Sequence, residues 1–309
     1  MSADRDTIAR VVRELLQAEL GPSAIGPSAG GDRQSAIGRR TSAYPSVIGA
    51  SALHAARCER PAPPLHEVDS PEVESVIPRL VATTSSQIAV GHRGLRFKTD
   101  LYLRMREGSA DAKDAVHSEV PDDWASAHGL LNLKSRCVDR GEYLLFPNHG
   151  RRLDDESLAA LGSAKGSRPD VQVIIGDGLS SNAVMKNGTE SLQELQRALG
   201  AAGYRTGTSM FVKYARIGVA DEIGVLTGAR ATVIVVGERP GLGTGDSLSF
   251  YIAVNPKLDQ DNAEKNCISN VRGIGIKPRE AADLTTNIIR RAFELGGGGV
   301  AIGFGFGRT

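Results

Sequence analysis

Gly176, Asp177, Gly178 and Ser180 form the segment whose residue types best suit a ligand-binding turn. They complete or follow the apolar run VQVIIG, which is typical of a buried strand, and a helical pattern comes next. Glycines let the backbone approach a ligand closely, and a serine at this point can cap the helix. The free N–H groups of such a helix start suit a phosphate. The alternative is a tight strand-to-helix turn that binds nothing.

A second candidate is Glu238, in the GERPG segment that leaves the apolar run ATVIVVG. Its carboxylate could accept hydrogen bonds from amide or hydroxyl groups of a ligand. The alternative is an ion pair with Arg239 or another base, which would only hold the loop. The GLGTG segment that follows leads into the strand pattern LSFYIAV and not into a helix. A nicotinamide cofactor is therefore not expected.

The cysteines and histidines show no pattern of a metal site. Cys58, Cys137 and Cys267 are odd in number and far apart, which argues against a disulfide framework and indicates a reducing compartment. Neither C-x-x-C nor H-E-x-x-H is present, so no metal ligands are expected. A hydrolase that uses Ser180 or Asp177 is a weak alternative, because Ser180 does not stand in a G-x-S-x-G motif.

From Arg168 onward, strand-like and helix-like patterns alternate. The expected strands are VQVIIG, MFVKYARIGV, ATVIVVG and LSFYIAV, and the expected helices lie around Leu192, over Ala220–Gly228 and from Pro278 onward. This alternation predicts an α/β fold with a doubly wound, Rossmann-like and mostly parallel sheet. Ligands bind beyond the carboxyl ends of such strands, where GDGLSS, RIGV and GERPGL occur.

The first half of the chain is of different composition. Residues 1–20 contain an amphipathic helical pattern, and 21–70 are mostly rich in Gly, Pro, Ser and Ala, as in a flexible linker. We expect a small helical domain over 71–149 and the α/β domain over 150–309. The helix alone is too short to be stable in water, so it is expected to order when it docks on another surface.

The charge balance and hydropathy exclude two classes of partner. Lys and Arg total 37 against 36 for Asp and Glu, so no net field attracts nucleic acid or an anionic membrane. No apolar run reaches the roughly 18 residues that cross a bilayer. The N-terminus lacks the apolar core of a secretory signal, and a cytoplasmic protein is expected.

Six blocks in sequence order resemble the small subunit of ethanolamine ammonia-lyase. They are VPDDWASAHGLLNLKSR, GRRLDDE, IIGDGLSSNAV, RIGVADEIGVLTGARATVIVVGERPG, DSLSFYIAVNP and NCISN. The resemblance implies an adenosylcobalamin-dependent conversion of ethanolamine to acetaldehyde and ammonia, with the substrate held by a large partner subunit. Matched residue by residue, it implies that Ile217, Glu238 and Cys267 contact the cobalamin. The phosphate at the GDGLSS turn would then belong to the nucleotide tail of the cofactor.

Further expectations follow from the resemblance. The chain lacks D-x-H-x-x-G, the motif whose histidine displaces the cofactor's own base from cobalt, so base-on binding is expected. We expect no catalytic residue in this chain, and packing but not metal ligation from Cys267. The helix in residues 1–20 would dock the lyase on the shell of a bacterial microcompartment. The alternative is a non-catalytic nucleotide-binding or microcompartment assembly protein built on the same sheet.

Overall fold

The computed structural model describes residues 76–83, 88–242 and 245–302. The predicted docking helix in residues 1–20 and the linker over 21–70 lie outside the described residues. The chain divides into two compact units, Met1–Pro63 and Pro64–Thr309, and the elements below belong to the second.

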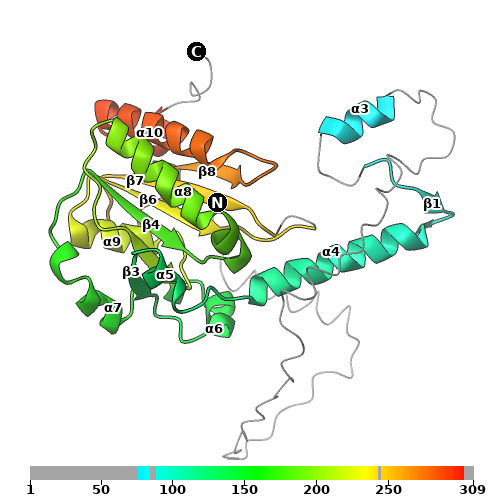
Figure 1. Cartoon of the computed structure of the whole chain (residues 1–309), viewed down its shortest axis with the longest axis horizontal. Helices are drawn as coiled ribbons and strands as arrows, with labels where there is room; N and C mark the ends of the chain where they lie inside the picture. Colours follow the sequence, from blue (N-terminus) through cyan, green and yellow to red (C-terminus); the bar gives the residue numbers. More distant parts are fainter. Residues whose placement is uncertain (1–75, 84–87, 243–244, 303–309) are drawn as a thin grey trace, which may run out of the picture. The chain divides into compact units, whose positions relative to one another are not determined.

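The second unit is built around a six-stranded sheet (Figure 1). Its strands are β3 (Leu131–Lys134), β4 (Val171–Gly176), β5 (Met210–Lys213), β6 (Ala231–Gly237), β7 (Leu248–Val254) and β8 (Lys265–Val271). They lie in the order β3-β5-β4-β6-β7-β8. The first four of that order are parallel, and β7 runs antiparallel to β6 and to β8. Every residue of β4 and β6 is buried, as their continuous apolar runs predicted.

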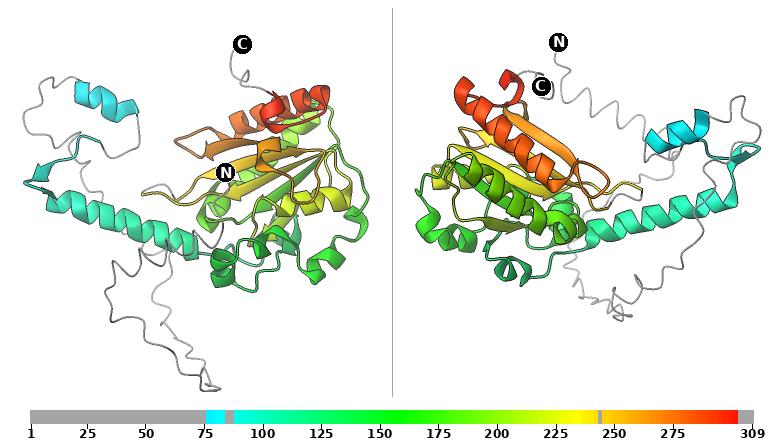
Figure 2. Two further views of the ribbon diagram at one scale, coloured as in Figure 1. Left: turned by 180° about the vertical axis from the view of Figure 1, so that it is seen from behind. Right: turned by 45° about the horizontal axis from the view of Figure 1, so that its top comes forward.

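Helices cover both faces of this sheet. α8 (Ser181–Ala201) and α10 (Pro278–Leu295) pack side by side on one face (Figures 1 and 2). α9 (Val219–Thr227) and α7 (Asp155–Ala160) contribute to the core on the other face. The helices predicted around Leu192, over Ala220–Gly228 and from Pro278 onward are thus confirmed, and Pro278 occupies the first turn of α10.

The remaining elements lie before the sheet's central strands, between the strands or after α10. Before β4 stand α3 (Val76–Thr83), β1 (His92–Arg93), β2 (Arg96–Phe97), α4 (Thr99–His117), α5 (Trp124–Ala127) and α6 (Arg140–Leu145). The 3-10 turns are η1 (His149–Arg151), η2 (Gly162–Ala164), η3 (Asn262–Glu264) and η4 (Gly299–Ile302). Within the segment 71–149, expected to be a helical domain, β3 pairs with β5 and extends the main sheet.

The predicted α/β class is confirmed, but the sheet is mixed. β6 and β7 are joined by residues 238–247, a connection too short for the crossover helix that parallel neighbours require. They pair instead as an antiparallel hairpin, with Gly237 opposite Leu248. The alternation of strands and helices predicted parallel pairing correctly where a helix intervenes, and not at β7, where none does. β8 was not among the predicted strands.

Candidate functional site

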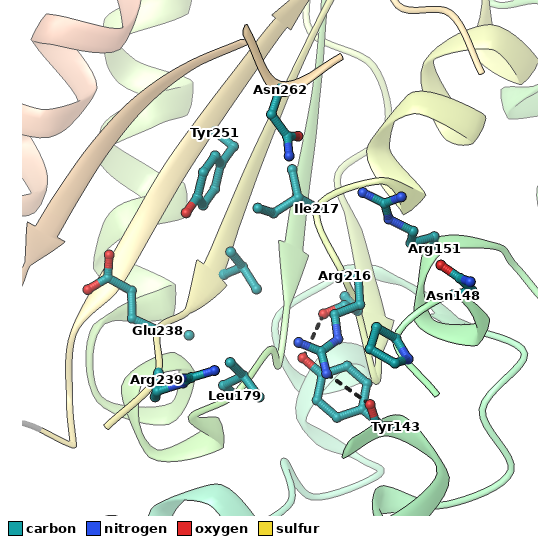
Figure 3. Close-up of a pocket in the computed structure, with 14 residues that line it drawn as sticks. Tyr143, Asn148, Arg151, Leu179, Arg216, Ile217, Glu238, Arg239, Tyr251 and Asn262 are labelled. Atoms are coloured by element: carbon teal, nitrogen blue, oxygen red, sulfur yellow. Dashed lines mark hydrogen bonds between the residues drawn. The ribbon is translucent and has the colours of Figure 1, made fainter. Parts of the chain in front are cut away.

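A cavity of about 580 Å³ opens at the carboxyl ends of β4, β5 and β6 (Figure 3). The segments that follow these strands contribute Leu179, Ile217 and Glu238 to its wall. Residues of α6, η1, β7 and η3 complete the lining. The carboxyl edge of parallel strands is the usual ligand site of α/β sheets, because the loops that diverge there leave a crevice.

Glu238 lies half-buried at the end of β6 and lines the cavity. Its carboxylate accepts hydrogen bonds from the hydroxyls of Ser247, at 2.8 Å, and Ser249. Ser249 belongs to β7, the hairpin partner of β6, and Ser247 stands directly before it. The N–H of Glu238 donates to the Ser247 carbonyl at 3.0 Å. Among the described residues no ion pair joins Glu238 to Arg239. The carboxylate is therefore oriented by hydroxyl groups, and it keeps lone pairs for further donors.

Ile217 follows β5 immediately before α9. Backbone hydrogen bonds hold this loop before and after Ile217. The N–H of Arg216 donates to the carbonyl of Gly150 at 2.8 Å, and the N–H of Ala220 donates to the carbonyl of Ile217 at 3.1 Å. Ile217 packs partly into the core beneath α9 and lines the cavity with its exposed part. It offers apolar surface at a fixed position.

Cys267 lies on β8 directly opposite Tyr251 of β7. Tyr251 lines the cavity, so Cys267 stands one strand farther from its centre. The residue is exposed, but desolvation of its sulfur still raises the pKa of the thiol. Burial likewise raises the pKa of Tyr251 to about 12. Both groups are uncharged near neutral pH, which suits packing and hydrogen bonding more than nucleophilic chemistry.

The GDGLSS turn packs against the end of β6. Gly178 has a φ of 59°, and a Cβ at this position would collide with the backbone of Gly237. The N–H of Leu179 donates to the Gly237 carbonyl at 2.9 Å. Ser180 is the predicted N-cap of α8, and its hydroxyl accepts from the N–H of Ala183 at 3.2 Å. The N–H groups of Leu179 and Ala183 thus already donate to acceptors within the protein. This geometry favours a strand-to-helix turn that binds nothing over a phosphate site.

Asp177 is fully buried and faces the loop after β5. Its Oδ1 accepts from the N–H of Ala215 at 3.3 Å, and its Oδ2 lies 3.7 Å from a guanidinium nitrogen of Arg140. Burial raises the pKa of Asp177 to about 6, against the opposing attraction of Arg140. At Gly176, a Cβ would lie only 2.6 Å from that of Ala215. Both residues shape the loop that carries Ile217, and neither lines the cavity.

The comparison with protein families covers the whole of this site. The family model of the ethanolamine ammonia-lyase light chain (EutC) matches residues 74–303. The chain belongs to the ethanolamine ammonia-lyase light chain family. It is thus one subunit of a lyase that acts in ethanolamine utilisation, and a light chain implies a larger partner.

Several residues that line the cavity were not predicted from the light-chain sequence. Tyr143, Asn148 and Arg151 come from α6, η1 and the turn between them, which precede the strands that predicted the site. Arg216 adjoins the expected Ile217, but it was not singled out. The repeated pairing of glycine with arginine, in GRR and RIG, is the signal that could have drawn attention to both arginines.

Two negative findings bear on the light chain. Among the described residues, no group of three or more His, Cys, Asp and Glu side chains is placed to hold a metal ion. Within the same part of the chain, no helix has the length and apolarity that crossing a membrane requires.

Proposed function

We propose that this light chain binds adenosylcobalamin together with the large subunit of ethanolamine ammonia-lyase, in the conversion of ethanolamine to acetaldehyde and ammonia. The observation that supports this proposal is the convergence of Ile217, Glu238 and Tyr251 on one cavity. Cys267 stands opposite Tyr251 on the neighbouring strand. Residues matched to cofactor contacts from separate segments thus lie along one side of the fold.

The lining of the cavity suits a corrin ring. Leu179, Ile217 and the ring of Tyr251 offer apolar surface, and the carboxylate of Glu238 can accept hydrogen bonds from corrin carboxamides. A corrin with its nucleotide tail is larger than a cavity of about 580 Å³, so this chain covers only part of the cofactor. The large subunit would cover the remainder and exclude water.

The residues of this chain bind and orient the cofactor. When bound, adenosylcobalamin supplies the radical chemistry that removes a hydrogen atom from the substrate. Ile217 and Glu238 fix the position of the corrin, and the loops after β5 and β6 keep water from its edge.

Coexpression with the large subunit tests the proposal. The loaded complex should keep a corrin absorbance spectrum through dialysis and form acetaldehyde, whereas the light chain alone should show no turnover. In the Co(II) state, nitrogen labelling of the dimethylbenzimidazole should change the hyperfine pattern in electron spin resonance. A change on labelling protein histidine would contradict base-on binding, and a complex that retains no corrin would overturn the proposal.

We also propose that the amphipathic pattern in residues 1–20 docks the enzyme on a microcompartment shell. The support is the sequence alone: an apolar stripe on a short helix, followed by a linker over 21–70. Residues 1–21 fused to a fluorescent protein should form puncta in cells that make shells. Leu15→Asp places a charge on the stripe and should abolish the puncta without loss of lyase activity. Diffuse fluorescence of the unchanged fusion would contradict the docking function.

A further inference from the structure

Arg151 and Arg216 bring guanidinium groups to the same cavity (Figure 3). Arg151 is the last residue of η1, and Arg216 lies in the loop between β5 and α9. Their segments are far apart in the sequence, but a hydrogen bond from the backbone N–H of Arg216 to the carbonyl of Gly150 joins them at 2.8 Å. The pair is therefore a feature of the fold and not of one loop.

Glycines make room for both arginine side chains. A Cβ at Gly150 would lie 2.7 Å from Cγ of Arg216, and a Cβ at Gly218 would lie 3.2 Å from Cγ and Nε of Arg151. Each arginine thus packs over a glycine from the segment that carries the other arginine. The arrangement orders two long cationic side chains along the wall of one cavity, which costs side-chain entropy.

Little negative charge in the described part of the chain offsets these two guanidinium groups. Among the described residues, neither Arg151 nor Arg216 forms an ion pair. The carboxylate of Asp221 acts electrostatically with Arg151, but it is held by the ammonium group of Lys265 at 2.8 Å. In the same cavity, the carboxylate of Glu238 accepts from serine hydroxyls. The cavity therefore carries a net positive charge on this side.

Arg216 is also incompletely hydrogen-bonded. Its Nη2 donates to the carbonyl of Tyr143 at 2.9 Å, and its guanidinium stacks on the Tyr143 ring with 4.2 Å to the centroid. Its Nε is buried without a partner in the protein. Because a buried donor without an acceptor costs free energy, the site is incomplete without a ligand acceptor.

We infer that Arg151 and Arg216 form a phosphate-binding subsite. A phosphate oxygen would complete the hydrogen bonds of Arg216, and the planar fork of a guanidinium matches phosphate geometry. Resting on the proposed function, the ligand group is the phosphodiester in the nucleotide tail of the cobalamin. This places the phosphate beside η1 and not at the start of α8, where the sequence predicted it.

Two corrins that differ by the phosphate test the subsite. Adenosylcobinamide phosphate and adenosylcobinamide are titrated into the coexpressed complex, and their dissociation constants are measured from the corrin absorbance. The wild-type complex should bind adenosylcobinamide phosphate with a dissociation constant at least about 10-fold lower than that of adenosylcobinamide, as expected for charge-assisted hydrogen bonds. Arg216→Met and Arg151→Met should each reduce this preference to about threefold or less, because the lost donors contact only the phosphate. Arg216→Lys should keep an intermediate preference.

Arg152→Met is the matched control. It removes the same charge from the next residue, but the guanidinium of Arg152 is bound to Asp259 at 2.7 Å and Arg152 does not line the cavity. Its preference for the phosphate form should equal that of the wild type. Melting temperatures of all variant complexes are measured in parallel, and the Arg151 variants test the subsite independently if Arg216→Met does not fold.

The outcomes separate the subsite from the proposed function. If both corrins bind and the arginine variants keep the full preference, the subsite is wrong and the cofactor assignment stands. If neither corrin binds the wild-type complex, the cofactor assignment is wrong. In that case AMP and inorganic pyrophosphate are titrated: binding that Arg216→Met abolishes supports the subsite with a free nucleotide or phosphate as its ligand. No binding of any of these probes overturns both.

Discussion

The turn after β4 and the loop after β6 leave neighbouring strands at the same edge of the sheet, and each places an acidic residue beside glycine. Asp177 is fully buried and binds the backbone of the β5 loop, whereas Glu238 is half-buried and lines the cavity. β4 is followed by α8, and the turn between them is hydrogen-bonded to the end of β6. β6 is followed instead by the hairpin connection to β7. Similar residues thus take a structural role in one loop and a ligand-facing role in the other.

Gly178→Ala, in the turn after β4, should cause the largest loss of stability. A Cβ would lie 2.8 Å from the backbone N of Gly237, at a φ of 59° that disfavours alanine. Strain and overpacking together should lower the free energy of unfolding by about 3 kcal/mol or more. Urea unfolding of the light chain, followed by the fluorescence of its single tryptophan, Trp124, measures the change.

Gly203→Ala is the control for backbone strain alone. Gly203 also has a positive φ, of 78°, but no atom lies within 4 Å of the Cβ position. This variant should lose only about 1 kcal/mol. Equal losses in the two variants would mean that the turn after β4 is not packed against β6 as tightly as the structure has it.

The pH dependence of stability should distinguish Asp177 from a ligand-facing carboxylate. Its folded-state pKa of about 6 lies above the ordinary value of 3.8. The folded state binds this proton more tightly, so the stabilisation is fully present below about pH 4 and is lost as pH rises through about 6. The free energy of unfolding of the wild type, minus that of Asp177→Asn, should therefore fall by about 3 kcal/mol from about pH 4 to pH 7.

Denaturant unfolding at a series of pH values measures this difference. Asp155→Asn removes an exposed carboxylate from α7 and serves as the control for surface charge. A difference for Asp177→Asn that does not change with pH would show that Arg140 fully offsets the cost of burying the charged carboxylate, so that folding does not raise the pKa of Asp177.

Glu238→Ala should weaken cofactor binding in the complex and spare the fold. Loss of one or two hydrogen bonds to the cofactor costs about 1–3 kcal/mol, which is about 5- to 150-fold in the dissociation constant. Equilibrium dialysis of adenosylcobalamin against the complex measures it, with ethanolamine affinity expected to change less. Glu264→Ala, which removes an exposed glutamate paired with Lys257, is the control. Unchanged cofactor affinity in a complex with an unchanged melting temperature would refute the role of Glu238.

The comparison also shows which parts of the structure the sequence could predict. The apolar runs of β4 and β6 and the stripe of α10 are local patterns, so these elements were predicted with their types and near their bounds. β7 pairs antiparallel with β6 and with β8 because no crossover helix separates these strands. The alternation of strand and helix patterns did not predict this pairing.

The site was harder to predict for a different reason. Glu238 and the RIGV segment follow strands whose ends meet at one edge, and the family resemblance singled out Ile217 within that segment. Arg151 and Tyr143 reach the cavity from segments before the first of these strands, and only tertiary packing brings them there. The burial of Asp177 depends on Arg140 and on the β5 loop, which are distant in the sequence.

Cys267→Ser should have the smallest effect on cofactor binding. The serine keeps the backbone of β8 and nearly the same volume, and its hydroxyl can interact with Tyr251 and Ser249 as the thiol does. The ordinary pKa of a thiol lies above neutral pH and desolvation raises that of Cys267 further, so the substitution removes no charge. Affinity for adenosylcobalamin in the complex should change by less than about threefold, within the range of one altered weak hydrogen bond. A loss of about 10-fold or more would show that the sulfur itself contacts the cofactor, and that the ligand-facing wall extends one strand beyond Tyr251.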